Sequence, residues 1–447
     1  MARAKKETAL TPEERLQAAL VPDWERPYKL PENWCWTTVG AINQYVGISA
    51  DPTKAKNKTF ELYSVPSSAD NYPEIVLGAD IGSTKQSVKK GDVLLCKINP
   101  RINRVWKVSK YTDHSLLASS EWIVIRNSGL ISNYLMWCFR SPYFRGYMLS
   151  NVSGVGGSLM RAQPKFVQGY PVPVPPLAEQ QRIVDRIESL FAKLDEAKEK
   201  AQAVVDSFET RRAAILHKAF TGELTAKWRE EHGVSIDNWK TTRFDSVAAI
   251  RSNLVDPAEY QSFPHIAPDN IEKKTGVLLE YHTIAEDGVT SGKHRFYSGQ
   301  ILYSKIRPYL SKAVVVDFDG LCSADMYPIE AYQNARCLWY YMLSDEFLLQ
   351  ASTAGSRSVL PKINQKELSA LTLHLPTNDR EQEEIARILD ELFDKEQQTK
   401  EAAEVVLDQI DLMKKSILAR AFRGELGTND PSEEGAVELL KEIIRRG

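Results

Sequence analysis

Residues 180–193 read QQRIVDRIESLFAK and residues 382–395 read QEEIARILDELFDK, and this pair of stretches decides the fold. A second pair follows in the same register, RAAILHKAFTGEL at 212–224 and KKSILARAFRGEL at 414–426. Each match lies 202 positions further along the chain, as Ile417 does after Ile215. Chance does not keep one register across two separate blocks, so the chain is predicted to contain a duplicated unit.

The repeat extends upstream of these blocks, with looser matches. The segment GDVLLCKINPR at 91–101 resembles GQILYSKIRPY at 299–309, and GGSLMRAQPKF at 156–166 resembles AGSRSVLPKIN at 354–364. A period near 200 residues is too long for a solenoid. The pattern therefore predicts one variable globular domain followed by one well-matched helical arm, present twice.

Each arm is predicted to be one long helix. From Glu179 to about Lys218 the chain has no Gly and no Pro, and apolar residues recur at alternating spacings of four and three, which indicates a coiled-coil seam. A helix of roughly 35–40 residues would be about 50–60 Å long. The predicted seam residues are Ile183, Ile187, Leu190, Leu194, Ile385, Leu389, Leu392 and Val406, with Met413 beyond them, and the polar Glu396 and Thr399 interrupt the second seam.

A narrow apolar stripe does not stabilise a single helix in water, so each arm needs a partner. The other arm is the economical choice, and because a globular domain separates the arms in the chain, the pair would be antiparallel. The alternative is that each arm packs on its own domain or on another subunit.

The two globular stretches mix short apolar runs that suit strands, such as 93–98 and 301–306, with aromatic helical stretches at 133–149 and 336–352. We expect α+β domains, each a twisted β structure with a supporting helix. The expected order is an N-terminal arm (1–30), a first globular domain (31–176), a first helical region (177–232), a second globular domain (233–376), and a second helical region with the C-terminal tail (377–447).

Bulk properties leave the function open but exclude several classes. With 447 residues, two or three domains are expected. The basic N-terminus has no apolar stretch behind it, and no apolar run approaches the roughly 18 residues that span a bilayer, so a cytoplasmic protein is expected. The five cysteines form no C-x-x-C motif, so no metal site is predicted.

Basic loops are the candidate binding feature. The stretch from Lys97 to Lys110 has five basic residues and no acidic one, although the net charge of the chain is −2. Any single basic loop is more often a solvated surface, but matching loops in two divergent copies favour nucleic-acid binding. The candidate DNA-binding residues are Lys97, Asn99, Arg101, Arg104, Arg161, Lys165, Lys305, Arg307, Tyr309, Lys312, Arg357 and Lys362.

No catalytic residues are predicted. The string GVTSGKH at 288–294 is one residue short of a phosphate-binding loop, no N-P-P-Y or D-P-P-Y segment of an amino methyltransferase occurs, and the histidines are scattered. Two alternatives stay open at this point: a coiled-coil interaction scaffold without DNA specificity, and a fused DNA methyltransferase or nuclease chain.

The segments AEQQRIVDRIESLF with AILHKAFTGEL, and REQEEIARILDELF with SILARAFRGEL, together resemble the repeated conserved regions of type I restriction-modification specificity subunits. The tail at 430–443 is similar to the closing helix of that family. The resemblance extends over nearly the whole chain in architecture.

This resemblance implies a non-catalytic subunit that recognises a bipartite double-stranded DNA target. Each globular domain would read one half, and the helices would fix the spacer between the halves. It implies assembly with two modification subunits, which hold S-adenosylmethionine, and with two restriction subunits, which use ATP and Mg. No cofactor is expected in this chain. Docking of the modification subunits is expected at the A-F-x-G-E-L segments, at Phe220, Glu223, Phe422 and Glu425.

Overall fold

The computed structural model describes residues 11–154, 160–354 and 361–446. The chain forms two compact units, Met1–Lys200 with Val406–Gly447 (unit 1) and Ala201–Val405 (unit 2). Each unit therefore contains part of both long helices. Among the described residues, no helix combines the length and the apolar character that a membrane span requires.

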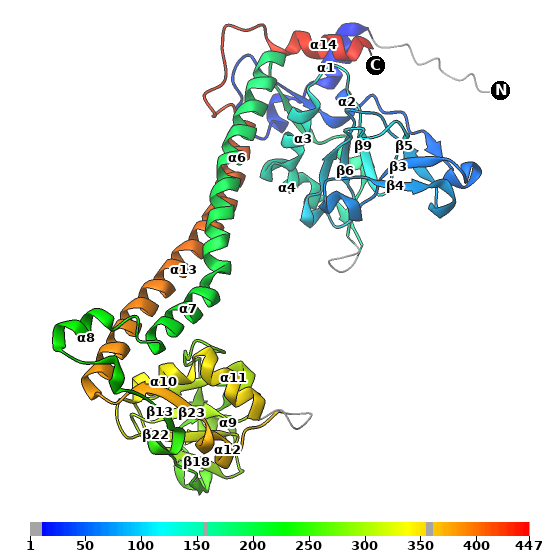
Figure 1. The fold of residues 1–447 in the computed structure, drawn as a ribbon. Helices are drawn as coiled ribbons and strands as arrows, with labels where there is room; N and C mark the ends of the chain where they lie inside the picture. The colour runs from blue at the N-terminus through cyan, green and yellow to red at the C-terminus, as the bar shows by residue number, and fades with distance from the viewer. Residues whose placement is uncertain (1–10, 155–159, 355–360, 447) are drawn as a thin grey trace. The chain divides into compact units, whose positions relative to one another are not determined.

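Unit 1 is an α+β structure built on a five-stranded sheet in the order β2-β5-β8-β3-β4 and a three-stranded sheet in the order β7-β6-β9 (Figure 1). Strand β3 pairs in parallel with β8, and the other pairs in these sheets are antiparallel. Strand β1 pairs with β12, and β10 with β11. The strands are β1 (Cys35–Thr38), β2 (Ser49–Ala50), β3 (Thr59–Tyr63), β4 (Glu74–Leu77), β5 (Lys85–Ser87), β6 (Val93–Cys96), β7 (Val105–Lys107), β8 (Ser115–Ala118), β9 (Trp122–Ile125), β10 (Val152–Ser153), β11 (Arg161–Ala162) and β12 (Pro171–Val174).

Unit 2 repeats this topology. Its five-stranded sheet has the order β15-β18-β21-β16-β17, its second sheet has the order β14-β22-β19-β20, and β13 pairs with β23. Strand β16 pairs in parallel with β21, as β3 does with β8. The strands are β13 (Trp239–Arg243), β14 (Ala248–Ile250), β15 (Leu254–Val255), β16 (Pro264–Ile266), β17 (His282–Thr283), β18 (Lys293–Phe296), β19 (Ile301–Ser304), β20 (Ala313–Val315), β21 (Gly320–Cys322), β22 (Met326–Ala331) and β23 (Thr372–Pro376). The duplication seen in the sequence is thus a duplication of fold.

The helices lie beside these sheets, and α3 contacts β6 and β7 in unit 1 (Figure 1). The helices with most of their length in unit 1 are α1 (Pro12–Ala19), α2 (Val39–Ile42), α3 (Ser132–Arg140), α4 (Pro142–Ser150), α5 (Pro164–Val167), α6 (Leu177–Asp206) and α14 (Ala436–Arg446). Those in unit 2 are α7 (Phe208–Phe220), α8 (Ala226–His232), α9 (Ile284–Asp287), α10 (Ala335–Met342), α11 (Asp345–Ala354) and α12 (Gln365–Ala370), and α13 (Asp379–Ala421) belongs to both units.

The supporting helix of each domain is two short helices, so the prediction of one helix over 133–149 and one over 336–352 is wrong. In unit 1, Ser141 lies between α3 and α4, and its Oγ accepts a hydrogen bond from Phe144 N at 3.2 Å. In unit 2, Ser344 Oγ accepts one from Phe347 N at 3.4 Å in the same way. A proline at position 142 also disfavours helical backbone at the residue before it. A serine cap therefore starts a new helix in both copies.

The long helices run antiparallel within each unit, as predicted. In unit 1, Lys198 Nζ lies 3.5 Å from Asp411, and Asp195, nearer the start of α6, pairs with Lys414. In unit 2, the Lys400 ammonium lies 4.9 Å from the Phe208 ring centroid. The Arg212 guanidinium lies 3.8 Å from the ring centroid of Phe393. In both units the residue numbers rise along one helix as they fall along the other.

The polar break in the second seam is filled by an ion pair. Arg211 Nε lies 2.7 Å from Glu396 Oε2, and both side chains are partly buried. Thr399 is exposed and lies outside the seam. A long arginine from the facing helix thus occupies the space that a leucine would fill.

The predicted seam positions differ in burial along the arms. Most predicted positions are buried or half-buried, but Val406 is 40% exposed and Met413 is 48% exposed. Leu407 and Lys414 are half-buried instead, and Lys414 pairs with Asp195 of α6. Burial after Ala403 therefore follows a spacing of four and then three. The fully buried positions are Ile183, Ile187, Ile385 and Leu389, and the half-buried ones are Leu190, Leu194 and Leu392.

The first arm is interrupted, so the prediction of one helix from Glu179 to about Lys218 needs correction. Helix α6 ends at Asp206 and α7 begins at Phe208. Ser207 Oγ donates to the Ala203 carbonyl at 2.5 Å, and this kind of back-bonding bends helices. Helix α13 has no such break over its 43 residues.

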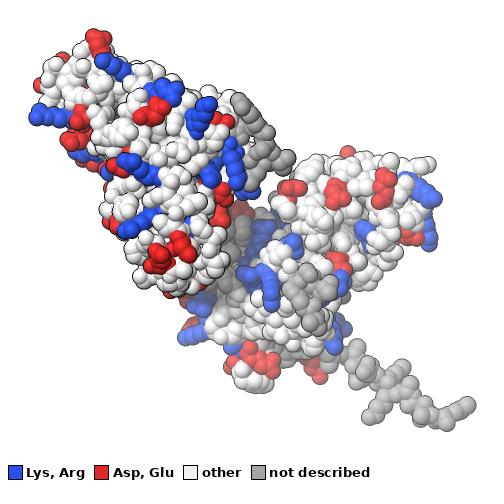
Figure 2. All heavy atoms as spheres, turned by 90° about the horizontal axis from the view of Figure 1, so that it is seen from below, with Lys and Arg blue, Asp and Glu red and all other residues white. Residues whose placement is uncertain are grey.

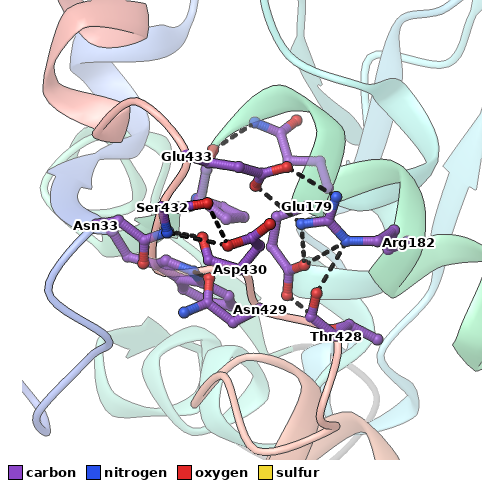
Figure 3. Close-up of polar contacts among 11 residues, drawn as sticks. Asn33, Glu179, Arg182, Thr428, Asn429, Asp430, Ser432 and Glu433 are labelled. Atoms are coloured by element: carbon purple, nitrogen blue, oxygen red, sulfur yellow. Dashed lines mark hydrogen bonds and ion pairs between the residues drawn. The ribbon is translucent and has the colours of Figure 1, made fainter.

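A Glu-Gln pair at the start of each arm connects segments within its own unit. Glu179 is buried and accepts hydrogen bonds from Thr428 Oγ1 at 2.6 Å and from Arg182 Nε at 3.0 Å. Burial raises the pKa of Glu179, and the bonds from Thr428 and Arg182 oppose that rise. Arg182 also forms two 2.8 Å bonds to Glu433, so the C-terminal segment is fastened to unit 1 (Figure 3).

Unit 2 has the same arrangement at the equivalent glutamate. Glu381 is buried, and its Oε1 accepts from Thr225 Oγ1 at 2.8 Å, Arg229 Nη1 at 2.7 Å and Trp239 Nε1 at 3.0 Å. The following Gln382 donates to the carbonyl of Pro376 at 2.8 Å. In each unit, therefore, the start of one arm is bonded to the segment that follows the end of the other.

Candidate nucleic-acid interface

Two loops of unit 1 that lie far apart in sequence are joined by backbone hydrogen bonds. Asn99 N donates to the Met160 carbonyl at 2.8 Å, and Ala162 N donates to the Lys97 carbonyl at 2.8 Å. Ile98 and Arg161 form the β-bridge between these two bonds. The segments 97–104 and 160–165 are called here the paired loops of unit 1.

Unit 2 joins its own two loops in the same way. Arg307 N donates to the Pro361 carbonyl at 2.8 Å, and Ile363 N donates to the Lys305 carbonyl at 2.9 Å. Ile306 and Lys362 form the bridge. The segments 305–312 and 361–363 are the paired loops of unit 2, and Lys362 is the structural counterpart of Arg161.

The turn in the first segment of each pair has the same backbone conformation. In unit 1 a short 3-10 turn, Pro100–Ile102, lies between Asn99 at φ +46° and Asn103 at φ +53°. In unit 2 the turn Pro308–Leu310 lies between Arg307 at φ +47° and Ser311 at φ +46°. Left-handed backbone is unfavourable for a side chain as large as arginine, so its repetition in both copies indicates a required shape.

The turn presents different side chains to the surface in the two units. Arg101 is exposed and Ile102 is 52% exposed, whereas the equivalent surface of unit 2 carries Arg307 and Tyr309, the latter 48% exposed. The residue that closes each turn is bonded to a neighbouring helix, since Asn103 Nδ2 donates to the Arg140 carbonyl at 3.1 Å and Ser311 Oγ donates to the Met342 carbonyl at 3.4 Å. The scaffold is conserved between the copies and the exposed residues are not.

The structure brings most of the predicted DNA-binding residues into the paired loops, with different exposure. Lys165 is exposed beside Phe166, with its ammonium 4.8 Å from the ring centroid. Lys97, Asn99 and Arg104 are half-buried. Arg357 lies outside the described residues.

Two predicted lysines of unit 2 point their charge into their own unit. Lys312 is mostly buried, and its Nζ donates to the Pro268 carbonyl at 2.7 Å. Lys305 Nζ donates to the Ala324 carbonyl at 2.5 Å. Burial, with the nearby charge of Lys305, also lowers the pKa of His294 behind the loops. These placements argue against direct DNA contacts by Lys305 and Lys312.

Acidic residues lie beside the basic loops, which the sequence analysis missed. Arg161 Nε lies 3.3 Å from Glu121 Oε2, and Lys362 Nζ lies 3.2 Å from Asp325 Oδ1. On the face shown in Figure 2, basic and acidic side chains are interspersed. On that face the basic side chains are not separated from the acidic ones. These acids come close to the loops only through strand pairing, so the sequence could have indicated them only if the pairing of the strands were already known.

The predicted docking residues divide into buried and exposed ones. Phe220 and Phe422 lie in the apolar cores of units 2 and 1, 5% and 0% exposed. Glu223 and Glu425 are exposed. The two phenylalanines thus hold their own units together, and any docking surface here consists of the residues around them.

The described residues contain no group of three or more His, Cys, Asp or Glu side chains placed to hold a metal ion. All five cysteines are buried.

Comparison with known proteins identifies the family. The sequence model of the type I restriction modification DNA specificity domain matches residues 47–205 and 236–406, one match in each half of the duplication. The chain belongs to this specificity family. It is a specificity subunit of a type I restriction-modification system and recognises a DNA target.

Specificity subunits with assigned roles are similar over most of this chain. The EcoDI specificity subunit of Escherichia coli is 36% identical over 345 residues, which are 72% of this chain and 76% of the relative. The EcoKI specificity subunit of Escherichia coli strain K12 is 22% identical over 89% of this chain and 90% of the relative. Both are named as subunits of type I restriction enzymes, so the family entails partner subunits.

Solved structures share the fold. A chain of a type I R-M system complex superposes with a TM-score of 0.70 at 20% identity, covering 90% of this chain and all of that one. The HsdS subunit from Thermoanaerobacter tengcongensis superposes with a TM-score of 0.63 at 21% identity, with the same coverage. The two-domain specificity fold is thus present despite low sequence identity.

Proposed function

We propose that each unit reads one half of a bipartite double-stranded DNA target through its paired loops. The observation that carries this proposal is the pair of identical loop scaffolds with different exposed residues, Arg101 and Ile102 in one unit and Arg307 and Tyr309 in the other. A shared scaffold keeps the docking geometry, while different exposed side chains read different bases.

The chemistry of the exposed residues suits the major groove. Arginine can bond guanine through two atoms, and a tyrosine or an apolar side chain can contact a thymine methyl group or a sugar. Each base contact of this kind is worth about 1–3 kcal/mol of discrimination. The exposed Lys165 and the partly exposed Arg104 would add phosphate contacts, which set position without reading sequence.

The paired long helices would fix the unread spacer between the two half-sites. A long helix pair can separate two reading domains by one or more turns of DNA, about 34 Å each. This role rests on the antiparallel contacts described above in each unit, such as Arg211 with Glu396.

The remaining surfaces of the arms would dock two modification subunits. Helix α13 carries exposed apolar side chains at helical spacing away from the seam, and an apolar stripe of this kind suits a partner helix. These residues are Val405, Val406, Leu412 and Met413. The exposed Glu223 and Glu425 lie at equivalent positions, which favours two equivalent docking sites. A native mass of the complex with one modification subunit per chain would contradict this stoichiometry.

The chain would itself be non-catalytic and hold no cofactor. The modification subunits would bind S-adenosylmethionine and methylate adenine, and two restriction subunits would use ATP and Mg in the cytoplasm. Purified chain that transferred a labelled methyl group without partners would overturn this division of roles.

Mapping methylated adenines in cells with and without the chain gives the target, because a split motif should appear only with the chain present. Binding of the full complex to that motif and to a scrambled duplex then tests the loops. Arg101→Ala and Tyr309→Ala should each weaken binding to the motif about 5- to 150-fold. Lys54→Ala, an exposed lysine on another loop of unit 1, is the matched control. Unchanged binding by both loop variants would show that the paired loops are not the reading surface.

A further inference from the structure

In each unit, a base from the second segment of the paired loops lies beside an acid at the same structural position. In unit 2 that acid, Asp325, also lies 4.0 Å from Lys305. In unit 1 the Arg161 guanidinium forms two contacts with Glu121, at 3.3 and 3.4 Å. In unit 2 the Lys362 ammonium lies 3.2 Å from Asp325. The side chains of Arg161 and Lys362 are 46% and 47% exposed, so both bases stand at the surface with a carboxylate beside them.

The two acids occupy equivalent positions in the fold. Glu121 immediately precedes β9, which pairs with β6, and Asp325 immediately precedes β22, which pairs with β19. The backbone carbonyl of each acid also accepts a hydrogen bond from the first loop residue. Lys97 N donates to the Glu121 carbonyl and Lys305 N to the Asp325 carbonyl, both at 3.0 Å. The residue pairs that define the equivalence are Cys96 with Trp122, Ser304 with Met326, Ile98 with Arg161 and Ile306 with Lys362.

The charge pair is retained although both of its members differ between the copies. Unit 1 combines the longer base with the longer acid, Arg with Glu, and unit 2 combines Lys with Asp. A surface salt bridge adds little to stability, so folding alone gives a weak reason for keeping both members in two divergent domains.

We propose that Glu121 and Asp325 are specificity-determining residues that position Arg161 and Lys362 and oppose their use on the DNA backbone. This inference rests on the proposed function of the paired loops. A phosphate that approaches Arg161 also approaches the carboxylate of Glu121, and like charges at this range repel. An acceptor on a base edge, such as guanine O6 or N7, carries only a partial negative charge, so the carboxylate repels it much less than it repels a phosphate.

The carboxylate also has a favourable partner in the groove. The amino groups of cytosine and adenine donate hydrogen bonds that a carboxylate can accept, and phosphates offer none. The acid-base pair therefore favours base edges and penalises backbone contacts. Building a cost against the wrong partner is an established way of gaining discrimination.

The test removes the charge and keeps the shape, with Glu121→Gln in unit 1 and Asp325→Asn in unit 2. The full complex is titrated with a random-sequence duplex and with a duplex that carries the methylated motif, at several salt concentrations. Each variant should bind the random duplex about three- to tenfold more tightly, and the magnitude of its salt slope should rise by about 0.9, because the released cation gains one phosphate contact. The ratio of motif to random affinity should fall by the same factor.

The controls separate this proposal from the proposed function. Asp23→Asn removes an exposed acid that pairs with Arg26 at 2.6 Å in unit 1, outside the paired loops, and should change neither affinity nor slope. Arg161→Ala should weaken binding to the motif. If Arg161→Ala weakens binding but Glu121→Gln leaves the random-duplex affinity and slope unchanged, or lowers both affinities equally, the role of the acids is wrong. If Arg161→Ala is silent as well, the paired loops are not the interface and both proposals fall.

Discussion

Replacement of Glu381 by alanine tests how much the buried carboxylate at the start of α13 stabilises unit 2. Its side chain is fully buried, and its Oε1 is the acceptor for Thr225, Arg229 and Trp239 at 2.7–3.0 Å. Alanine would leave an arginine that is only 11% exposed without its carboxylate, together with two neutral donors. Breaking a buried charge pair by removing one partner costs about 3–5 kcal/mol. For a unit of this size that cost corresponds to a decrease in Tm of about 6–20 °C.

Differential scanning calorimetry is the suitable assay, because a chain with two units need not unfold in one transition. The Glu381→Gln variant keeps an oxygen acceptor for Thr225 and Trp239 and loses only the charge, so it should lose about 1.5–3 kcal/mol, less than the alanine variant. Glu223→Ala, an exposed glutamate that follows helix α7, should change stability by less than about 0.5 kcal/mol. A loss below about 1 kcal/mol for Glu381→Ala, or equal losses for alanine and glutamine, would refute the reasoning.

Three further predictions follow from the arms. A double-mutant cycle on Arg211 and Glu396 should give a coupling of about 1 kcal/mol, since the pair is partly buried; an uncoupled pair would mean that it only fills space. Hydrogen bonding to Arg182 lowers the pKa of Glu433 below its ordinary 4.5. The Glu433 carboxylate therefore stabilises the fold above pH 4.5, and this stabilisation is lost as the pH falls through the lowered pKa. Urea titrations at pH 3–7 should show that the stability of Glu433→Gln depends less on acid than that of the unchanged chain. Inserting one heptad after Ala197 and another at the facing position of α13 should lengthen the spacer in the methylated motif, and an unchanged spacer would contradict the measuring role of the arms.

Periodicity predicted the arms well because one seam position recurs every 3.5 residues, and burial must follow that spacing. The prediction failed at Val406 because Glu396 and Lys400 are polar. They interrupt the apolar pattern, so the position of the seam beyond them cannot be read from it. From Ala403, a spacing of three then four leads through Val406 to Ile410, and a spacing of four then three leads through Leu407 to the same residue. Both paths consist of apolar residues, so only the contacts with the facing helix distinguish them. The contact of Lys414 with Asp195 shows which spacing is used.

The breaks in the helices could not be read from apolar content. The stretches at 133–149 and 336–352 are rich in aromatics throughout, yet each has a serine at which the backbone leaves the helix, Ser141 and Ser344. A serine in a helical stretch can point outward, bond back to the helix or cap a new one. Which of these occurs depends on the sheet against which the stretch packs. Two short helices can follow a twisted sheet, whereas one long straight helix would lose contact with it.

The candidate interface shows the same limit in its charges. A window along the sequence from Lys97 to Lys110 contains no acid, and a basic loop is the correct inference from that window. Strand pairing then places Glu121 beside the loop, because β9 returns antiparallel to β6, and a bridge at Ile98 brings Arg161 to the same point. Charge segregation along a chain therefore does not establish segregation on a surface. The duplication allows the two units of one chain to be compared with each other. Their exposed loop residues differ, yet each unit keeps an acid beside a base at the same position, and this retention points to a functional role for the pair.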